Sequence, residues 1–256
     1  MSPARRLLLS CLAVAVGVVV AVAVLARLLD SGGTPARAAQ VAQDVPGAIV
    51  LVPGYGGATG ALEVLAERLR ADGRTALVVD LPGDGTGDLR EAAGAVAGVV
   101  DAALASGSPS VDLVGYSAGG VVTRLLLAEE PDAAVRRVVT LGSPHAGSRL
   151  AGIGARFSPG ACPEACRQLV PGNDLLEDLE QTPDGPAWLS VWTELDEVVT
   201  PPDSARLDGA TNVVVQDVCP GNRVGHGDLP RDRAVQGLVL AALGTGPVAV
   251  PGACPT

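Results

Sequence analysis

The segment 115–119, Gly-Tyr-Ser-Ala-Gly, contains the residue best suited to chemistry in this sequence, Ser117. The apolar run 110–114 before it predicts a short buried strand, and the run 121–130 after it predicts a helix. A sharp turn from strand to helix at a Gly-x-Ser-x-Gly segment holds the serine exposed in a strained backbone conformation. Gly115 and Gly119 have no Cβ, so the strand and the helix can approach closely. The sequence therefore predicts that Ser117 is a nucleophile, and an ordinary strand–helix turn is the alternative.

A serine hydroxyl is a weak nucleophile and needs a base that is oriented by a third group. The sequence contains two histidines, His145 and His226. His226 follows the last predicted strand, and His145 follows an earlier one. The loops after parallel strands open at the same edge of a sheet. Both histidines are therefore placed near Ser117, and geometry alone leaves either of them as the base.

The third group is a carboxylate that orients the imidazole. Asp196 stands at the end of the predicted strand 188–195, directly before the part of the chain that leads to His226. From there its side chain can reach an imidazole in the next loop. Glu194, Glu197 and Asp203 are rival carboxylates, and their ordinary role is surface charge.

Cleavage of an acyl group also needs two backbone N–H groups that bind the developing oxyanion. One belongs to Ala118, directly after the proposed nucleophile, and the loop after the first strand provides the other at Tyr55. Gly54 and Gly56 flank Tyr55 and let this loop lie close to the substrate. A simple glycine-rich turn is the alternative.

The elements that position these residues alternate between strand and helix. Strands are predicted at 48–52, 75–79, 110–114, 135–141, 188–195 and 211–218, and helices around Leu62 to Leu69 and at 89–104, 121–130 and 229–243. This alternation predicts an α/β domain with a doubly wound, mostly parallel sheet of about six strands. The stretch between Ser148 and Pro186 is a short cap insertion with one predicted helix around 174–180.

Ser117, Asp196 and His226 occur in the chain order of the α/β-hydrolase fold. The segments 52–57, 115–119, 141–148 and 224–226, together with Asp196 and the run 206–213, resemble those of small bacterial secreted lipases and esterases. The similarity covers the region 46–243. It implies triacylglycerol lipase or carboxylesterase activity on an apolar ester, without a cofactor. One difference is that such lipases usually have His-Gly before the oxyanion residue, where this chain has Pro53-Gly54.

The same resemblance indicates which of the two histidines is the base, His226. If His145 were the base, the order would be Ser–His–acid, so His145 is interpreted as a residue that shapes the site. The short insertion predicts a small cap rather than a large mobile lid. A thioesterase or acyltransferase with the same triad is a second hypothesis. A third is a catalytically silent domain that serves in binding.

Charge and composition exclude several other functions. The chain has a net charge of −10 and no lysine, which rules out Ser–Lys dyads, Schiff-base lysines and phosphate-binding lysine loops. So acidic a body is a poor partner for nucleic acid or an anionic membrane. The two histidines are not at ligand spacing, and the acidic loop 80–88 matches no EF-hand, so we expect no metal site. We expect a monomer.

Residues 1–29 form a predicted membrane anchor or signal peptide. The run 7–26 contains no charged residue and is long enough for one membrane span, whereas Ala36-Arg37-Ala38 matches a cleavage site that lies far downstream. Both interpretations predict export, so the protein is expected to be extracytoplasmic, either anchored or secreted. A linker at 30–47 then leads into a catalytic domain at 48–256.

Four cysteines lie outside the N-terminal run, and an even number in an exported chain indicates two disulfides. Three connectivities are possible. We favour the neighbours Cys162 and Cys166 as one pair, which leaves Cys219 and Cys254 as the other. Free buried cysteines are the alternative.

Overall fold

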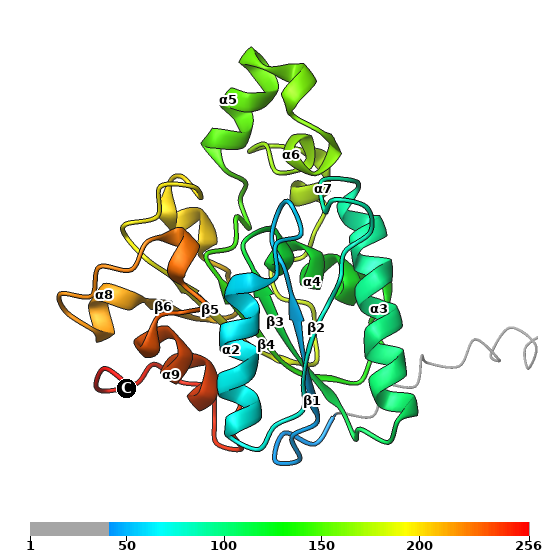
Figure 1. The fold of residues 1–256 in the computed structure, drawn as a ribbon, viewed down its shortest axis with the longest axis vertical. Helices are drawn as coiled ribbons and strands as arrows, with labels where there is room; N and C mark the ends of the chain where they lie inside the picture. Colours follow the sequence, from blue (N-terminus) through cyan, green and yellow to red (C-terminus); the bar gives the residue numbers. More distant parts are fainter. Residues whose placement is uncertain (1–40, 256) are drawn as a thin grey trace, which may run out of the picture. The chain divides into compact units, whose positions relative to one another are not determined.

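Six parallel strands form one sheet in the computed structural model, which describes residues 41–255 (Figure 1). Their order in the sheet is β2-β1-β3-β4-β5-β6. From β1 the chain first adds β2 on one side. It then returns to the other side of β1 and adds β3 to β6 outward in order, so the direction in which strands are added reverses between β1 and β3. Open α/β sheets bind ligands at such a switch point, outside the carboxyl ends of the strands. The strands are β1 (Ala48–Val52), β2 (Ala76–Val78), β3 (Val111–Tyr116), β4 (Val135–Leu141), β5 (Ala187–Trp192) and β6 (Thr211–Val214).

Helices cover both faces of this sheet, which confirms the predicted doubly wound architecture. In β1, Ile49 and Leu51 pack into one hydrophobic cluster, and Val50 and Val52 pack into the other. The first cluster includes residues of α2 (Gly60–Ala71) and α9 (Arg233–Ala242). The second includes residues of α3 (Leu89–Ala105) and α4 (Ala118–Glu129). An apolar strand without polar alternation therefore reflects burial on both sides.

The amino-terminal edge of the sheet is closed by a buried ion network. Asp112 of β3 is fully buried and accepts hydrogen bonds from Arg136 at 2.9 and 2.6 Å and from Arg74 at 2.9 Å. Arg136 also donates to the carbonyl oxygens of Leu243 and Gly244, which follow α9. This bidentate pairing fastens the end of the last helix to the edge of the sheet that lies away from Ser117.

The last strand and the last helix differ from the sequence-based expectation. The predicted strand 211–218 is a strand only to Val214, and α8 (Val215–Val218) then turns the chain. Gln216 of α8 accepts a hydrogen bond from the backbone N–H of Glu194, just beyond β5. The predicted helix 229–243 begins only at Arg233, because the side chain of Asp232 accepts from two backbone N–H groups and starts the helix there. β5 likewise ends at Trp192, three residues earlier than predicted.

The insertion between β4 and β5 contains more helix than the sequence pattern indicates. Its elements are α5 (Arg149–Phe157), the short 3₁₀ turn η1 (Pro159–Ala161), α6 (Glu164–Gln168) and α7 (Asp174–Glu177). α7 is shorter than the helix expected at 174–180, and α5 and α6 were not predicted. Glycines at two positions of α5 weaken its intrinsic helix propensity, which is why the sequence pattern does not indicate this helix; in the structure it lies against α6. We call the segment 149–168 the cap (Figure 1).

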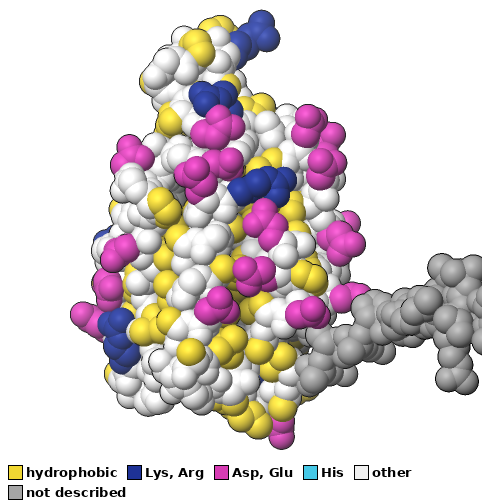
Figure 2. Space-filling view, turned by 90° about the vertical axis from the view of Figure 1, so that its right-hand side faces the viewer, with side chains coloured by type: hydrophobic (Ala, Val, Ile, Leu, Met, Phe, Trp, Pro, Cys, Tyr) yellow, Lys and Arg dark blue, Asp and Glu magenta, His cyan; other side chains and the backbone are white. Residues whose placement is uncertain are grey.

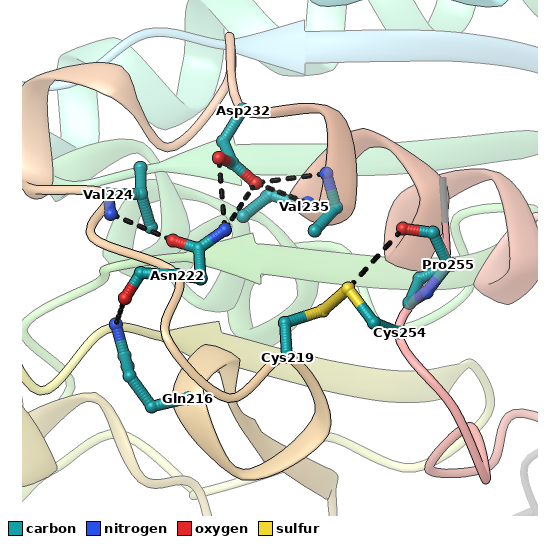
Figure 3. Close-up of a disulfide and its surroundings, with 9 residues drawn as sticks. Gln216, Cys219, Asn222, Val224, Asp232, Val235, Cys254 and Pro255 are labelled. Carbon is teal, nitrogen blue, oxygen red and sulfur yellow. Dashed lines mark hydrogen bonds between the residues drawn. A yellow bond between two sulfur atoms is a disulfide. The ribbon is translucent and has the colours of Figure 1, made fainter.

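Two disulfides join the four cysteines in the pairing that the sequence analysis favoured. Cys162–Cys166 lies within the cap, and Cys219–Cys254 joins the end of α8 to the C-terminal tail. Figure 3 shows the second bridge beside Asn222, whose side chain donates to Asp232 at the start of α9. The loop that leads to His226 is therefore held from two sides.

The predicted anchor or signal peptide at 1–29 and most of the linker at 30–47 lie outside the described residues. Among residues 41–255, no helix has the length and apolar character that a membrane crossing requires.

Candidate active site

Ser117 lies in the turn between β3 and α4 in a strained backbone conformation. Its φ is 54° and its ψ is −126°, and no other non-glycine residue among residues 41–255 has a positive φ. Its backbone N–H donates to the carbonyl oxygen of Leu141 at 2.8 Å, which ties the turn to β4. A Cβ on Gly119 would lie 2.3 Å from the carbonyl oxygen of Val52, and one on Gly115 would collide with Gly120. The flanking glycines are required because strand, turn and helix are in direct backbone contact.

Ser117, His226 and Asp196 form a continuous chain of hydrogen bonds. The Nε2 atom of His226 lies 3.0 Å from Ser117 Oγ, and its Nδ1 atom lies 2.7 Å from Asp196 Oδ2. The other carboxylate oxygen, Oδ1, accepts from the backbone N–H groups of Val198 and Val199 at 2.9 and 2.7 Å. Since Nδ1–H donates to the carboxylate, a neutral imidazole presents its Nε2 lone pair to the serine hydroxyl. The structure thus brings together the three side chains selected from the sequence.

The rival carboxylates lie elsewhere. Glu194, Glu197 and Asp203 are exposed, and none of them forms a hydrogen bond or ion pair with His226. Asp196 is 5% exposed and occupies the tight turn after β5. The backbone N–H groups of that turn, rather than the position of Asp196 in the sequence, aim its carboxylate at the imidazole.

The two oxyanion donors predicted from the sequence lie on either side of the switch point. Ala118 is the first residue of α4, and Tyr55 follows β1. Neither backbone N–H donates to another residue within 41–255. A Cβ on Gly54 would lie 2.8 Å from Ser117 Cβ, so the loop after β1 rests directly against Ser117. The N–H of Gly56 donates to the carbonyl oxygen of Gly85 at 3.1 Å and fixes this loop to the next one.

A sequence model described as the alpha/beta hydrolase family matches residues 49–253. The chain belongs to the alpha/beta hydrolase family. Among solved structures, it is similar to the mature form of the Bacillus licheniformis lipase BlEst2, with 20% sequence identity and a TM-score of 0.64 over 78% of this chain and 93% of that one. It is also similar to Aspergillus fumigatus lipase B, with 17% identity and a TM-score of 0.62 over 81% of this chain and 54% of that one. At these identities the likeness to the solved structures shows the fold.

His145 occupies a different environment in this alpha/beta hydrolase. It is 2% exposed, its Nε2 lies 3.1 Å from Thr140 Oγ1, and its Nδ1 has no partner among the described residues. Because Thr140 Oγ1 donates onward to Ser190, it accepts from His145, which places the proton on Nε2. Burial and then the positive charge of Arg124 hold the pKa of His145 well below 6.5. His145 makes no hydrogen bond to Ser117, and its side chain fixes the loop after β4.

Arg124 of α4 holds the loop after β4 together with the segment that leads from α7 to β5. Its guanidinium donates to the carbonyl oxygens of Leu179, Glu180 and His145. The side chain has no carboxylate partner within the described residues, and burial lowers the pKa of Arg124 to about 10. This buried cation, satisfied only by carbonyl groups, ties two segments to the helix that begins after Ser117.

Tyr116 is a site residue that the sequence analysis missed. Its hydroxyl donates to the backbone carbonyl of His226 at 3.1 Å, and the two rings lie 5.3 Å apart. Burial, followed by the negative charge of Asp196, raises the pKa of Tyr116 to about 12. The phenol therefore stays protonated, and remains a donor, at neutral pH. The only sequence signal was an aromatic residue next to Ser117 in a chain with few aromatics.

A small cavity of about 20 Å³ adjoins Tyr55 and Ala118, the two predicted oxyanion donors. Its apolar wall comes from the loop after β2 and from two helices, through Leu81, Leu89, Ala92 and Val122. Within the described residues, no three His, Cys, Asp or Glu side chains converge in a way that could hold a metal ion. The groups that the structure brings to this edge include a hydroxyl, an imidazole, a carboxylate and two backbone N–H groups without a partner among residues 41–255.

Proposed function

We propose that this chain is an exported serine hydrolase that cleaves carboxylic esters of apolar acids through an acyl-enzyme. The observation that carries the proposal is the chain of hydrogen bonds from Ser117 through His226 to Asp196, on a serine held at a φ of 54°. A strained serine, an imidazole with its lone pair facing the hydroxyl, and a buried carboxylate behind it are the parts that nucleophilic acyl transfer needs.

In the first half of the reaction, Ser117 Oγ attacks the ester carbonyl carbon while His226 Nε2 accepts the hydroxyl proton. The carbonyl oxygen becomes an oxyanion, to which the N–H groups of Ala118 and Tyr55 donate. The C–O bond to the alcohol then breaks, and the imidazolium returns its proton to the departing oxygen. The products are the free alcohol and an acyl group bonded to Ser117.

In the second half, water attacks the acyl carbon, and His226 accepts one of its protons. Collapse of this second oxyanion breaks the bond to Ser117 Oγ, which takes the proton back from the imidazolium. Asp196 orients the imidazole throughout, because its Oδ2 accepts from Nδ1 of His226 while its Oδ1 is held by two backbone N–H groups. The cycle closes with no cofactor and no net change in the protein.

Three observations support an apolar ester and an extracytoplasmic location. The cavity beside the oxyanion residues has an apolar wall formed by Leu81, Leu89 and Val122, and two structural neighbours are lipases. Two disulfides are typical of proteins that work in an oxidising compartment. We propose that the protein acts as a monomer, either anchored or released.

The test combines Ser117→Ala with a series of nitrophenyl esters of increasing acyl length. We expect kcat to fall by about four to six powers of ten for every ester that the wild type cleaves, with the fold intact. A fluorophosphonate probe should label the wild type and leave Ser117→Ala unlabelled. Ser106→Ala is the matched control, because Ser106 is exposed at the end of α3.

Two results would contradict the proposal. One is a Ser117→Ala protein that keeps a tenth of wild-type turnover. The other is a wild-type protein that reacts with no probe and cleaves none of the esters, which is the behaviour of a catalytically silent binding domain.

A further inference from the structure

The outer face of α5 in the cap is apolar and uncovered. Leu150, Ile153 and Phe157 are 49%, 56% and 73% exposed, and their spacing places them on one side of the helix. Phe157, the one phenylalanine of the chain, is more exposed than any other large hydrophobic residue described. Three large apolar side chains exposed on one side of a short helix are unusual on a folded domain and indicate an interaction site.

The cap also has the opposite charge to the chain that carries it. Residues 149–168 contain three arginines and one glutamate, whereas the whole chain has a net charge of −10. Arg149 and Arg156 are exposed, and neither forms an ion pair with a described residue. The guanidinium of Arg156 lies 5.6 Å from the ring centroid of Phe157. In Figure 2 basic and hydrophobic side chains occupy the top of the molecule, and acidic side chains are spread below them.

Hydrogen bonds at two places hold the cap at the carboxyl edge of the sheet. At one, Ser148 Oγ donates to the carbonyl oxygen of Val198, and the N–H of Arg149 donates to Thr200. At the other, Gln168 donates to Asp88 at the start of α3. The first attachment is to the same short segment that donates to Asp196. The outer face of α5 is thus fixed relative to the catalytic groups and is exposed without any movement of the cap.

We propose that this face docks the protein on an anionic lipid surface. Leu150, Ile153 and Phe157 enter the region between headgroups and acyl chains, while Arg149 and Arg156 pair with lipid phosphates, as in amphipathic helices that lie in a membrane interface. The acidic body does not prevent this contact, because charges more than about 10 Å away are largely screened at an ionic strength of 0.1 M. A second copy is the weaker candidate, since two facing caps would bring their arginines together.

The test uses the full chain with Phe157→Trp as a local reporter. The native Trp188 and Trp192 are buried, and residues 1–40 contain no aromatic side chain, so the emission change reports position 157 whatever the N-terminal run does. We expect a blue shift and quenching by brominated acyl chains with phosphatidylglycerol–phosphatidylcholine vesicles. Vesicles of phosphatidylcholine alone should produce a much weaker change. Val64→Trp on α2, at an exposed site away from the cap, is the control and should not respond.

The charge contribution is tested by adding Arg149→Gln and Arg156→Gln to the Phe157→Trp chain. An arginine near an anionic surface strengthens binding about fivefold, so removing both should raise the lipid concentration for half-maximal change about 25-fold. The matched control removes two exposed arginines elsewhere, Arg68→Gln and Arg233→Gln, and should leave that concentration unchanged.

Three results would overturn the proposal. One is an emission spectrum of Phe157→Trp that anionic vesicles leave unchanged. The second is an equal response to both kinds of vesicle. The third is a blue shift that grows with protein concentration in the absence of lipid, which would assign the face to a second copy of the chain. None of these measurements needs turnover. A failure of the lipid-docking proposal can therefore be distinguished from a failure of the proposed ester hydrolysis.

Discussion

The loops after β4 and after β6 each place a buried histidine at the same edge of the sheet, yet the two side chains are in opposite situations. His226 has Asp196 on one ring nitrogen and Ser117 on the other. His145 has the hydroxyl of Thr140 on one nitrogen, no partner among the described residues on the other, and the cation Arg124 close by. A carboxylate stabilises a protonated imidazole, and a neighbouring guanidinium opposes it. Burial alone therefore does not tell which histidine is suited to act as a base. The charge of the side chain beside the imidazole, a carboxylate at His226 and a guanidinium at His145, makes the difference.

The largest expected effect comes from removing the imidazole beside Asp196. His226→Ala should lower kcat about as much as Ser117→Ala, by about four to six powers of ten, and the double variant should be little worse because triad members act as a unit. The measurement is kcat on a short-chain ester. If His145→Ala were inactive and His226→Ala active, the proposed triad, including Asp196, would be wrong.

A smaller effect is expected from the group that holds the backbone of His226. Tyr116→Phe keeps the ring contact and removes one neutral hydrogen bond, which should lower kcat about fivefold with little change in KM. Tyr55→Phe is the matched control, since Tyr55 is exposed and its hydroxyl bonds to no described residue. An equal loss in both variants, or a loss confined to KM, would mean that Tyr116 does not position the base.

The smallest effect on turnover is expected at His145, where the main consequence is a pH dependence of stability. The native pKa of His145 lies well below 6.5, so the unfolded chain takes up a proton that the native state does not bind. Wild-type stability should therefore fall by about 1.4 kcal/mol for each pH unit below about 6.5 relative to His145→Gln, which cannot titrate. Urea unfolding of both proteins between neutral and mildly acid pH measures this difference.

In the His145→Gln variant the introduced amide can still donate to Thr140 and keep the loop after β4 in place, so turnover at neutral pH should change less than about threefold, which corresponds to under about 1 kcal/mol in the barrier. A parallel pH dependence in both proteins would show that His145 is protonated in the native state.

The local pattern of the sequence determined the sheet and singled out Ser117 as the proposed nucleophile. Runs such as 48–52 and 135–141 are apolar without alternation, which is the signature of strands buried on both faces, and all six predicted strands exist. Ser117 was identifiable because its chemistry depends on neighbours within a few residues: the strand before it, the helix after it and two glycines. Periodicity and turn chemistry are local properties, so a sequence reports them directly.

Only the tertiary structure decided features that depend on partners far apart in the chain. The contact between His226 and Ser117 joins residues separated by 109 positions, and the contact between His226 and Asp196 joins residues separated by 30. The apolar run 211–218 is compatible with a strand throughout, and contacts between Gln216 and the end of β5 turn its second half into α8. The outer face of α5 likewise became visible only in the folded molecule, where α6 lies against the half-buried opposite side, because exposure is a property of the packed molecule.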